Sequence, residues 1–255
     1  SGKSVELDPA DPTEVSFTVT REKADAAASY NLKVLSNTDD VFVVPATVDF
    51  AAGAKEANVK ATFNNAEVGK TYSFEVALDD EVVNPYKSST RKSFTFKAVR
   101  VKWNSIGTGQ WIDNFWYGFW DEIEIQQRDD KPEYYRVKSL YTDDFVTSSG
   151  SALGTYKDYF VFKVSKDGYV TWDTPLCINT SYQDTGIDIL GHLPSELSPN
   201  FAADDEKSVA TYDDEGNIQY LTIAPYWYVG GLGGFGINNL YLAFPGYDLA
   251  SELGF

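Results

Sequence analysis

The stretch Val15-Ser16-Phe17-Thr18-Val19 decides the fold of the first part of the chain, because its apolar residues stand at every second position. A strand places alternate side chains on opposite faces, so this spacing predicts a strand with one buried face. The same alternation recurs at 30–34, 48–50, 59–63, 72–78 and 94–98. Six or seven short strands in about 90 residues predict an immunoglobulin-like β-sandwich over residues 13–100. The Asp- and Pro-containing residues 1–12 are expected to form a linker.

A second domain is expected over residues 101–255, because the composition changes near residue 100. All six tryptophans and 14 of the 17 tyrosines lie after that point. Strands are predicted at 122–126, 134–139, 159–165, 169–172, 208–212, 218–224 and 240–244, with a two-residue hairpin turn at Asp167-Gly168 and another hairpin at 213–217. Helix is expected only as one short turn over Leu193–Leu197. The predicted fold class is therefore all-β, with a larger antiparallel β sandwich or barrel-like domain second.

The charge of the chain narrows the choice of partners. The formal net charge is -17, and residues 101–255 carry 9 Lys and Arg against 23 Asp and Glu. Nucleic-acid binding requires a basic face that displaces counterions from phosphates, so nucleic acid and anionic membranes are excluded as partners. The acidic surface is expected to serve solubility, with an acidic ligand-binding patch as the alternative.

The protein is expected to be located outside the cytoplasm. No apolar run approaches the roughly 18 residues that a membrane-spanning helix needs. The chain contains no methionine, even at position 1, which favours a processed chain whose export signal has been removed. A lipid anchor attached upstream of Ser1 is compatible with this interpretation.

The residues that usually carry catalysis are scarce. Cys177 is the only cysteine and lies in the apolar stretch Pro175–Ile178, which predicts a buried, unreactive thiol. His192 is the only histidine and has no Gly-x-Ser-x-Gly elbow near it. Its neighbours Gly191 and Pro194 favour a surface or hydrogen-bonded loop histidine. We therefore expect no catalytic residues, no cofactor and no metal site.

Carboxylates offer the one enzymatic alternative. Glycoside hydrolysis needs two carboxylates across a cleft, and Asp121, Glu122 and Glu124 beside an aromatic segment are the best candidates. Alternate positions on a strand place Glu122 and Glu124 on the same face, however, and a solvated face is the expected outcome.

The glycine-rich segment Gly230–Gly236 superficially resembles a phosphate-binding loop. A dinucleotide fingerprint opens a helix, whereas another strand is predicted after Ile237, so phosphate binding is not expected. These glycines are expected to form a tight turn or to let the backbone pass close to neighbouring aromatic rings. Lining a ligand groove is the alternative function of this segment.

The aromatic clusters are the candidate binding site. Tryptophan and tyrosine combine an apolar face with a polar edge, so exposed rings stack on sugars and on protein partners. The candidate ligand-binding residues are Trp116, Trp120, Tyr226, Trp227 and Tyr228. Core packing is the alternative for many of these rings, because monomers seldom expose large apolar patches.

Two resemblances extend these predictions. Val15–Arg21, Val48–Gly53, Ala57–Phe63 and Tyr72–Leu78 resemble, in order and spacing, the Calx-β module, a seven-stranded sandwich common in adhesion and matrix proteins. Calcium-binding Calx-β modules use an acidic run before the last strands. The corresponding residues 64–71 lack most of those carboxylates, so the resemblance implies no calcium site here.

The second domain resembles, at 107–113, 133–138 and 226–231, a domain of surface lipoproteins from Bacteroidetes-type bacteria. Those proteins are described as adhesion or glycan-associated proteins, which implies a location in the bacterial cell envelope, surface-exposed or periplasmic. The function predicted is a non-enzymatic binding or adhesion protein with a carbohydrate or protein ligand. The alternatives are a glycoside hydrolase, an accessory subunit of a glycan-degrading system, and a purely structural stalk.

Overall fold

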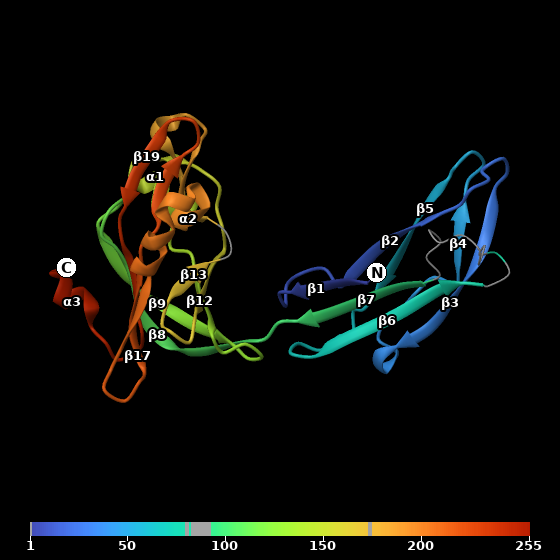
Figure 1. Ribbon diagram of the computed structural model, residues 1–255, viewed down its shortest axis with the longest axis horizontal. Coiled ribbons are helices and arrows are strands. Elements are labelled where there is room, and N and C mark those ends of the chain that lie inside the picture. Colours follow the sequence, from blue (N-terminus) through green and yellow to red (C-terminus); the bar gives the residue numbers. More distant parts are fainter. Residues whose placement is uncertain (1, 80–81, 83–92, 173–174) are drawn as a thin grey trace. The chain divides into compact units, whose positions relative to one another are not determined.

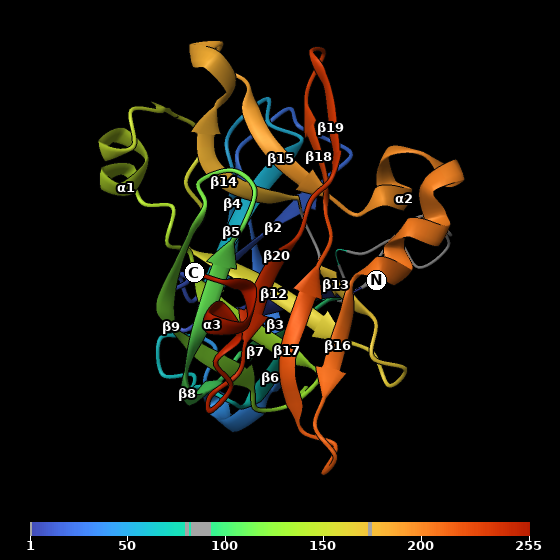
Figure 2. The ribbon, with the colours of Figure 1, turned by 90° about the vertical axis from the view of Figure 1, so that its left-hand side faces the viewer.

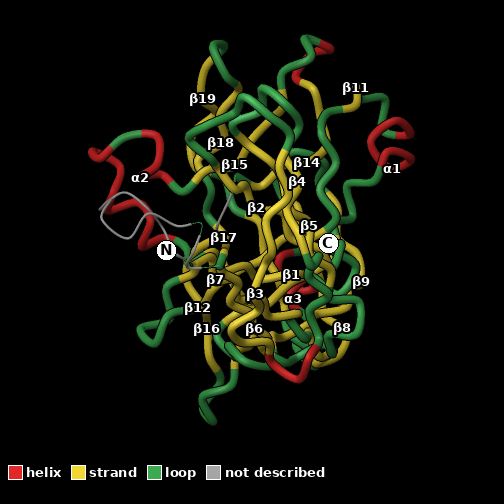
Figure 3. The backbone as a smooth tube through the Cα atoms, turned by 90° about the vertical axis from the view of Figure 1, so that its right-hand side faces the viewer, coloured by secondary structure: helices red, strands yellow, loops and turns green. Residues whose placement is uncertain are grey.

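The computed structural model describes residues 2–79, 82, 93–172 and 175–255. The chain forms two compact units, Ser1–Lys102 and Trp103–Phe255, which are described separately (Figure 1). Strands are the main regular secondary structure of each unit, and the helical segments are short (Figure 3). The predicted all-β fold class is confirmed.

The first unit is a sandwich of two sheets. Its five-stranded sheet has the order β1-β7-β6-β3-β4, and its second sheet pairs β2 with β5. The elements are β1 (Lys3–Leu7), β2 (Glu14–Thr20), β3 (Ala28–Asn37), β4 (Thr47–Phe50), β5 (Glu56–Thr62), β6 (Thr71–Leu78) and β7 (Ser93–Arg100), with the 3-10 helix η1 at Thr38–Asp40. Every pairing between described strands is antiparallel except that of β1 with β7.

The period-two pattern of the sequence produces the core of this sandwich. In β2, Val15 and Phe17 are buried while their neighbours are exposed. Phe17 packs against Phe74 across the sandwich (ring centroids 6.4 Å apart), and Phe74 in turn contacts Phe42 at 4.7 Å. Contacts of this kind in a buried cluster are worth about 0.5–1.5 kcal/mol beyond burial alone.

The predicted linker over residues 1–12 is wrong for its first half. Lys3–Leu7 forms β1, which pairs in parallel with β7 in the register Lys3↔Phe96 to Leu7↔Arg100. Val5 and Leu7 pack against the core of the sandwich. The alternation of Val5 and Leu7 is the signal for this strand, and its shortness beside Asp8 and Pro9 obscured that signal.

The second unit is built on an eight-stranded sheet that closes almost into a barrel. Its order is β13-β12-β10-β9-β8-β20-β17-β16. An isolated bridge, Tyr169↔Val209, joins the two edges, and the N–H of Val170 donates to the carbonyl of Ser208 at 2.8 Å. The strands are β8 (Trp103–Asp113), β9 (Phe119–Arg128), β10 (Tyr134–Lys138), β12 (Tyr159–Val164), β13 (Val170–Trp172), β16 (Val209–Tyr212), β17 (Ile218–Ile223) and β20 (Leu240–Ala243).

A second, five-stranded sheet packs against this barrel. Its order is β11-β14-β15-β18-β19, with β11 (Ala152–Leu153), β14 (Leu176–Ser181), β15 (Asp188–His192), β18 (Tyr226–Val229) and β19 (Gly233–Ile237). One buried cluster joins the two sheets and includes Trp111 and Phe162 from the barrel with Ile178 and Trp227 from the smaller sheet. Figure 2 shows β14, β15, β18 and β19 gathered at one end of the unit.

Helical segments are more numerous than the sequence predicted. The expected turn is present as α2 (Pro194–Leu197), but α1 (Asp143–Ser148), η2 (Tyr182–Asp184), η3 (Pro199–Lys207) and α3 (Leu249–Leu253) were not predicted. Each is too short to establish a 3.6-residue period. In the described part of the chain, none of the helices has the length and hydropathy that a membrane-spanning helix requires.

The hairpin predicted at Asp167-Gly168 is present, but its turn is longer than two residues. Strand β12 ends at Val164 and β13 begins at Val170. Gly168 takes a φ of 84° and its N–H donates to the carbonyl of Ser165 at 3.0 Å. The glycine therefore closes a wider turn, with its positive φ at the return into the second strand.

Candidate binding groove

A groove of about 590 Å³ opens in the second unit. Its lining comes from the 114–118 connection between β8 and β9, the 150–152 segment after α1, strand β14, the 3-10 helix η2 and strand β15. In Figure 3, α1 and β11 lie near β14 in the upper right of the picture. The volume lies in the range of about 300–1,000 Å³ that small-molecule sites usually occupy.

Aromatic side chains line the groove. Trp116, Tyr117 and Tyr182 contribute rings to its lining, and all three are partly exposed. Trp116 also contacts Phe235 at 5.1 Å, and Phe235 contacts Tyr182 at 5.3 Å. Phe235 is 38% exposed. The groove therefore borders a small, partly open aromatic surface.

Trp116 is anchored on the core of the second unit. Its ring meets the buried Trp227 edge-on at 5.8 Å. Its indole nitrogen is buried and has no hydrogen-bond partner among the described residues. A buried indole N–H usually has a partner, so this orphaned donor marks an incompletely satisfied position beside the groove.

Asp113 fixes the connection that carries Trp116. The residue is fully buried (0% exposed), and its Oδ1 accepts from the N–H groups of Phe115 (3.0 Å) and Trp116 (2.9 Å). Its Oδ2 accepts from the hydroxyl of Tyr141 at 2.9 Å. Burial raises the pKa of Asp113 above its usual range, while these hydrogen bonds act in the opposite direction.

Tyr141 continues this buried network. Its hydroxyl accepts from the indole N–H of Trp111 at 3.2 Å while it donates to Asp113. Complete burial raises the pKa of Tyr141 well above its usual value, so it remains a neutral donor. The network is structural in this arrangement, because its members are buried and Asp113 holds the backbone of Phe115 and Trp116.

Some polar side chains of the lining are hydrogen-bonded within the protein, and others are not. The hydroxyl of Thr180 is 2.6 Å from that of Tyr117 and donates to the carbonyl of Ile178, and the Ser181 hydroxyl accepts from the N–H of Gly186 at 2.8 Å. By contrast, the side chains of Ser151, Gln183 and Asp184 make no hydrogen bond within the described part of the chain. Gln183 and Asp184 are exposed, so both can bind a ligand.

Backbone strain concentrates beside this groove. Five described residues other than glycine have positive φ, and three of them are Asn179 (52°), Gln183 (47°) and Asp184 (58°). Such conformations cost of order 1–3 kcal/mol and tend to cluster at functional sites. The strain therefore favours a functional role for the segment from β14 into η2.

Asn179 ties this segment to α1. It is fully buried, and its Nδ2 donates to the carbonyl of Tyr141 (3.0 Å) and to Oδ1 of Asp143 (2.8 Å). Its Oδ1 has no partner among the described residues. Asn179 thus couples β14, whose neighbouring residues Ile178 and Thr180 line the groove, to the start of α1.

The structure does not gather the five predicted binding residues into one site. Trp116 lines the groove. Trp120 is 40% exposed on β9, on the sheet face opposite the core residues Ile123 and Ile125. It therefore lies outside the groove.

The three aromatic residues of β18 divide between two faces of their strand. Trp227 is 0% exposed and donates from its indole to the carbonyl of Asn238 at 3.0 Å, so it belongs to the core and presents no face to a ligand. Tyr226 and Tyr228 lie on the opposite face, where Tyr226 stacks on Phe201 at 5.3 Å. Neither tyrosine lines the groove. The alternation of the strand explains this separation.

The candidate catalytic residues are dispersed as well. Cys177 is buried, as predicted, and burial raises the pKa of its thiol. His192 lies on β15 rather than in a loop, and burial lowers its pKa, partly offset by Glu196, whose Oε2 is 3.7 Å from Nδ1. Glu122 and Glu124 share the exposed face of β9, as predicted.

The glycine-rich segment forms the β18–β19 hairpin. A Cβ on Gly234 would lie 2.5 Å from the ring of Tyr226, so the backbone does pass close to an aromatic side chain, as predicted. The hairpin also carries Phe235, which contacts two residues of the groove lining, Trp116 and Tyr182.

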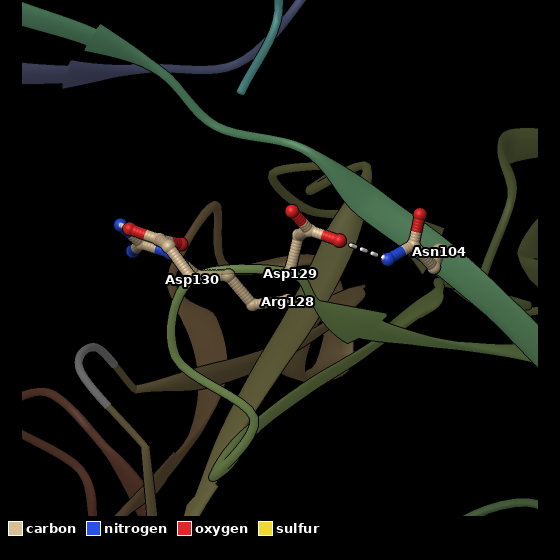
Figure 4. Close-up of polar contacts among 4 residues, drawn as sticks. All are labelled: Asn104, Arg128, Asp129 and Asp130. Carbon is tan, nitrogen blue, oxygen red and sulfur yellow. Dashed lines mark hydrogen bonds and ion pairs between the residues drawn. The ribbon is translucent and has the colours of Figure 1, made fainter. Parts of the chain in front are cut away.

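A separate polar cluster stabilises the turn after β9 (Figure 4). The amide of Asn104 donates to Oδ1 of Asp129 at 2.7 Å, and Nε of Arg128 donates to Oδ1 of Asp130 at 2.7 Å. Hydrogen bonding to Arg128 lowers the pKa of Asp130. Across the described residues, no group of three or more His, Cys, Asp or Glu side chains could hold a metal ion.

Several groove residues escaped prediction from the sequence. Tyr182, Gln183 and Asp184 lie in the segment Ser181–Gly186, which reads as an ordinary polar turn. The only motif in Asn179-Thr180-Ser181 is the Asn-x-Ser/Thr pattern of a glycosylation acceptor. The only signal for Tyr182–Asp184 in the sequence is an aromatic residue followed by polar residues and a glycine, and this pattern is common in surface turns.

Comparison with known proteins identifies no family. No family model matches the chain, and no curated protein matches it. Among solved structures, it is similar to a "putative carbohydrate binding protein" from Bacteroides ovatus, at 9% identity and a TM-score of 0.28, over 94% of this chain and 73% of that one. It is also similar to an auxiliary nutrient binding protein from Bacteroides thetaiotaomicron, at 8% identity and a TM-score of 0.28, over 95% and 89% of the two chains. Likeness of this degree assigns no ligand to this chain.

Proposed function

We propose that this chain is a non-catalytic binding protein and that its groove binds carbohydrate. The observation that carries the proposal is the meeting of two kinds of side chain in one depression. Trp116 and Tyr182 supply partly exposed rings, while Gln183 and Asp184 supply polar groups without partners in the described part of the chain.

This combination suits the surface of a sugar. The faces of a pyranose ring carry C–H groups that stack on an aromatic ring, whereas its edges carry hydroxyl groups that need hydrogen bonds. Apolar surface with a few placed polar groups is also the usual composition of a small-molecule site. The amide of Gln183 can both donate and accept, and the carboxylate of Asp184 accepts.

The composition of the groove supports binding without hydrolysis. Glycoside hydrolases use two carboxylates on opposite sides of the scissile bond. Asp184 is the one carboxylate among the described residues that line the groove. The alternative carboxylates Glu122 and Glu124 lie on the exposed face of β9 and do not line it.

The proposal extends to the rest of the molecule. We infer that the first unit, the Calx-β-like sandwich, acts as a stalk in a bacterial envelope protein, held there by a lipid anchor, and that the second unit contributes to adhesion through glycans. The resemblances of the sequence support this part. Protease shaving of intact cells that express the natural full-length protein tests it, since a surface protein is cleaved and an internal one is protected.

Glycan-array screening of the whole chain, followed by calorimetric titration of the best neutral oligosaccharide, tests the binding function. Tyr182→Ala and Trp116→Ala are expected to weaken binding at least tenfold, because removal of a central aromatic anchor costs about 2 kcal/mol or more. Trp120→Ala is the matched control, since it removes an exposed tryptophan outside the groove, and it should bind normally.

Trp116→Ala also tests folding, because its ring packs against Trp227. Tyr182 lies in η2 and is partly exposed, so its variant is expected to fold. If no glycan binds, or if Trp120→Ala abolishes binding while Tyr182→Ala does not, the groove is not a carbohydrate site.

A further inference from the structure

The charges around the groove restrict which glycans it can accept. This inference rests on the proposed function and concerns the same groove. None of the described residues that line it is Lys or Arg, whereas Asp184 is part of the lining and is exposed. A ligand carboxylate or sulfate would meet a negative charge there and no compensating positive charge in the lining.

The neighbouring charges add to this effect. Asp143, at the start of α1, accepts from Asn179 on β14, and Asp188, at the start of β15, accepts from the N–H of Thr155 at 3.0 Å. Both carboxylates are therefore fixed beside the strands that carry the groove. Lys157 does not line the groove, and its Nζ donates to the carbonyl of Pro175 at 3.1 Å.

The net charge of the second unit as a whole is also negative. Residues 101–255 carry 9 Lys and Arg against 23 Asp and Glu. Clefts lined by one sign of charge concentrate ligands of the opposite sign and repel those of the same sign. The local lining and the wider field thus act in the same direction.

We propose that the groove selects neutral or amino-bearing glycans and discriminates against uronic-acid and sulfated glycans. Asp184 is the main determinant of that choice, because it is the carboxylate in the lining and has no hydrogen-bond partner in the described part of the chain. Its oxygens accept from sugar hydroxyls or from an ammonium group.

A matched pair of ligands tests the selectivity. The neutral oligosaccharide that binds best is compared with the same oligosaccharide after oxidation of its primary hydroxyls to carboxylates. Two carboxylates about 6 Å apart at a partly hydrated surface repel enough to change affinity between about threefold and about tenfold. The oxidised ligand should bind weaker by that factor, and added salt should narrow the difference.

Substitution assigns the effect to the groove. Asp184→Asn should reduce the preference for the neutral ligand, measured as the ratio of the two dissociation constants. Asp214→Asn removes the same charge from the β16–β17 turn, outside the groove, and should leave that ratio unchanged.

These experiments distinguish failure of the selectivity from failure of carbohydrate binding. Equal or tighter binding of the oxidised ligand, or an equal effect of both substitutions, overturns the selectivity while leaving carbohydrate binding in place. Absence of binding to every glycan overturns the proposed function, and the selectivity with it.

Discussion

Replacing Asp113 with alanine should destabilise the second unit and loosen the groove. In the folded chain this carboxylate accepts from two backbone N–H groups, those of Phe115 and Trp116, and from the Tyr141 hydroxyl, at 2.9–3.0 Å. Alanine removes all three acceptor contacts and leaves the donors in a buried region. Each buried donor without a partner costs about 1–3 kcal/mol.

The net loss is smaller than the sum of these three costs. Burial of the Asp113 carboxylate is itself unfavourable, as its raised pKa indicates, and water can enter to reach some of the donors. We therefore expect Asp113→Ala to lose about 2–4 kcal/mol of unfolding free energy. Asp113→Asn keeps one carbonyl oxygen for the backbone donors and should lose about 1 kcal/mol.

Tryptophan fluorescence during urea unfolding is the appropriate assay, because all six tryptophans lie in the second unit. With a denaturant slope of about 1–3 kcal/mol per molar urea, the alanine variant should shift the midpoint by about 1–2 M. Glycan affinity should fall in the same variant, since the connection that carries Trp116 loses its anchor. A midpoint shift below about 0.3 M would refute the anchoring role.

The pH dependence of the same variants gives an independent check. The pKa of Asp113 is raised in the folded state, so its contribution to stability is fully present below the unfolded value of about 3.9 and is lost as pH rises through the folded value. Asparagine does not titrate. The stability deficit of Asp113→Asn should therefore be larger in acid than at neutral pH, and a deficit independent of pH would contradict the assignment.

Three further predictions concern positions outside the groove. Gly191→Ala should cost about 1–3 kcal/mol, because its Cβ would lie 3.1 Å from the ring of Trp227, whereas Gly230→Ala meets only one atom at 3.8 Å and should be near neutral in the same urea assay. Because the pKa of His192 is lowered, its contribution to stability is present above about pH 6.5 and is lost as the pH falls through its folded-state pKa. His192→Gln should therefore reduce the pH dependence of the melting temperature below about pH 6.5. The buried Cys177 thiol should react with a thiol reagent only at the rate of unfolding, and rapid labelling of the native chain would contradict its burial.

The sequence predicted the strands best where one face is solvated. The alternation at Val15 and Phe17 appears in the structure as buried positions separated by exposed ones. Strand β14 was missed because all six of its residues are buried, so Leu176–Ser181 shows no alternation. Strand β8 was missed because glycine and polar residues interrupt its pattern over Trp103–Asp113.

The candidate site was harder to predict because burial of an aromatic ring depends on tertiary packing. Trp116 and Trp120 belong to one aromatic run, yet Trp116 lines the groove whereas Trp120 lies on the exposed face of β9. Part of the groove lining comes from η2, where Gln183 and Asp184 adopt positive φ. Aspartate adopts this conformation more often than most residues do but glutamine seldom does, so these two residues alone did not predict it.

The location of a bound sugar tests the central claim most directly. A crystal structure of the whole chain with its best neutral oligosaccharide should show a sugar ring against Trp116 or Tyr182, with hydroxyls hydrogen-bonded to Gln183 or Asp184. Density for the sugar at Trp120 or on the outer face of β18, with the groove empty, would contradict the account.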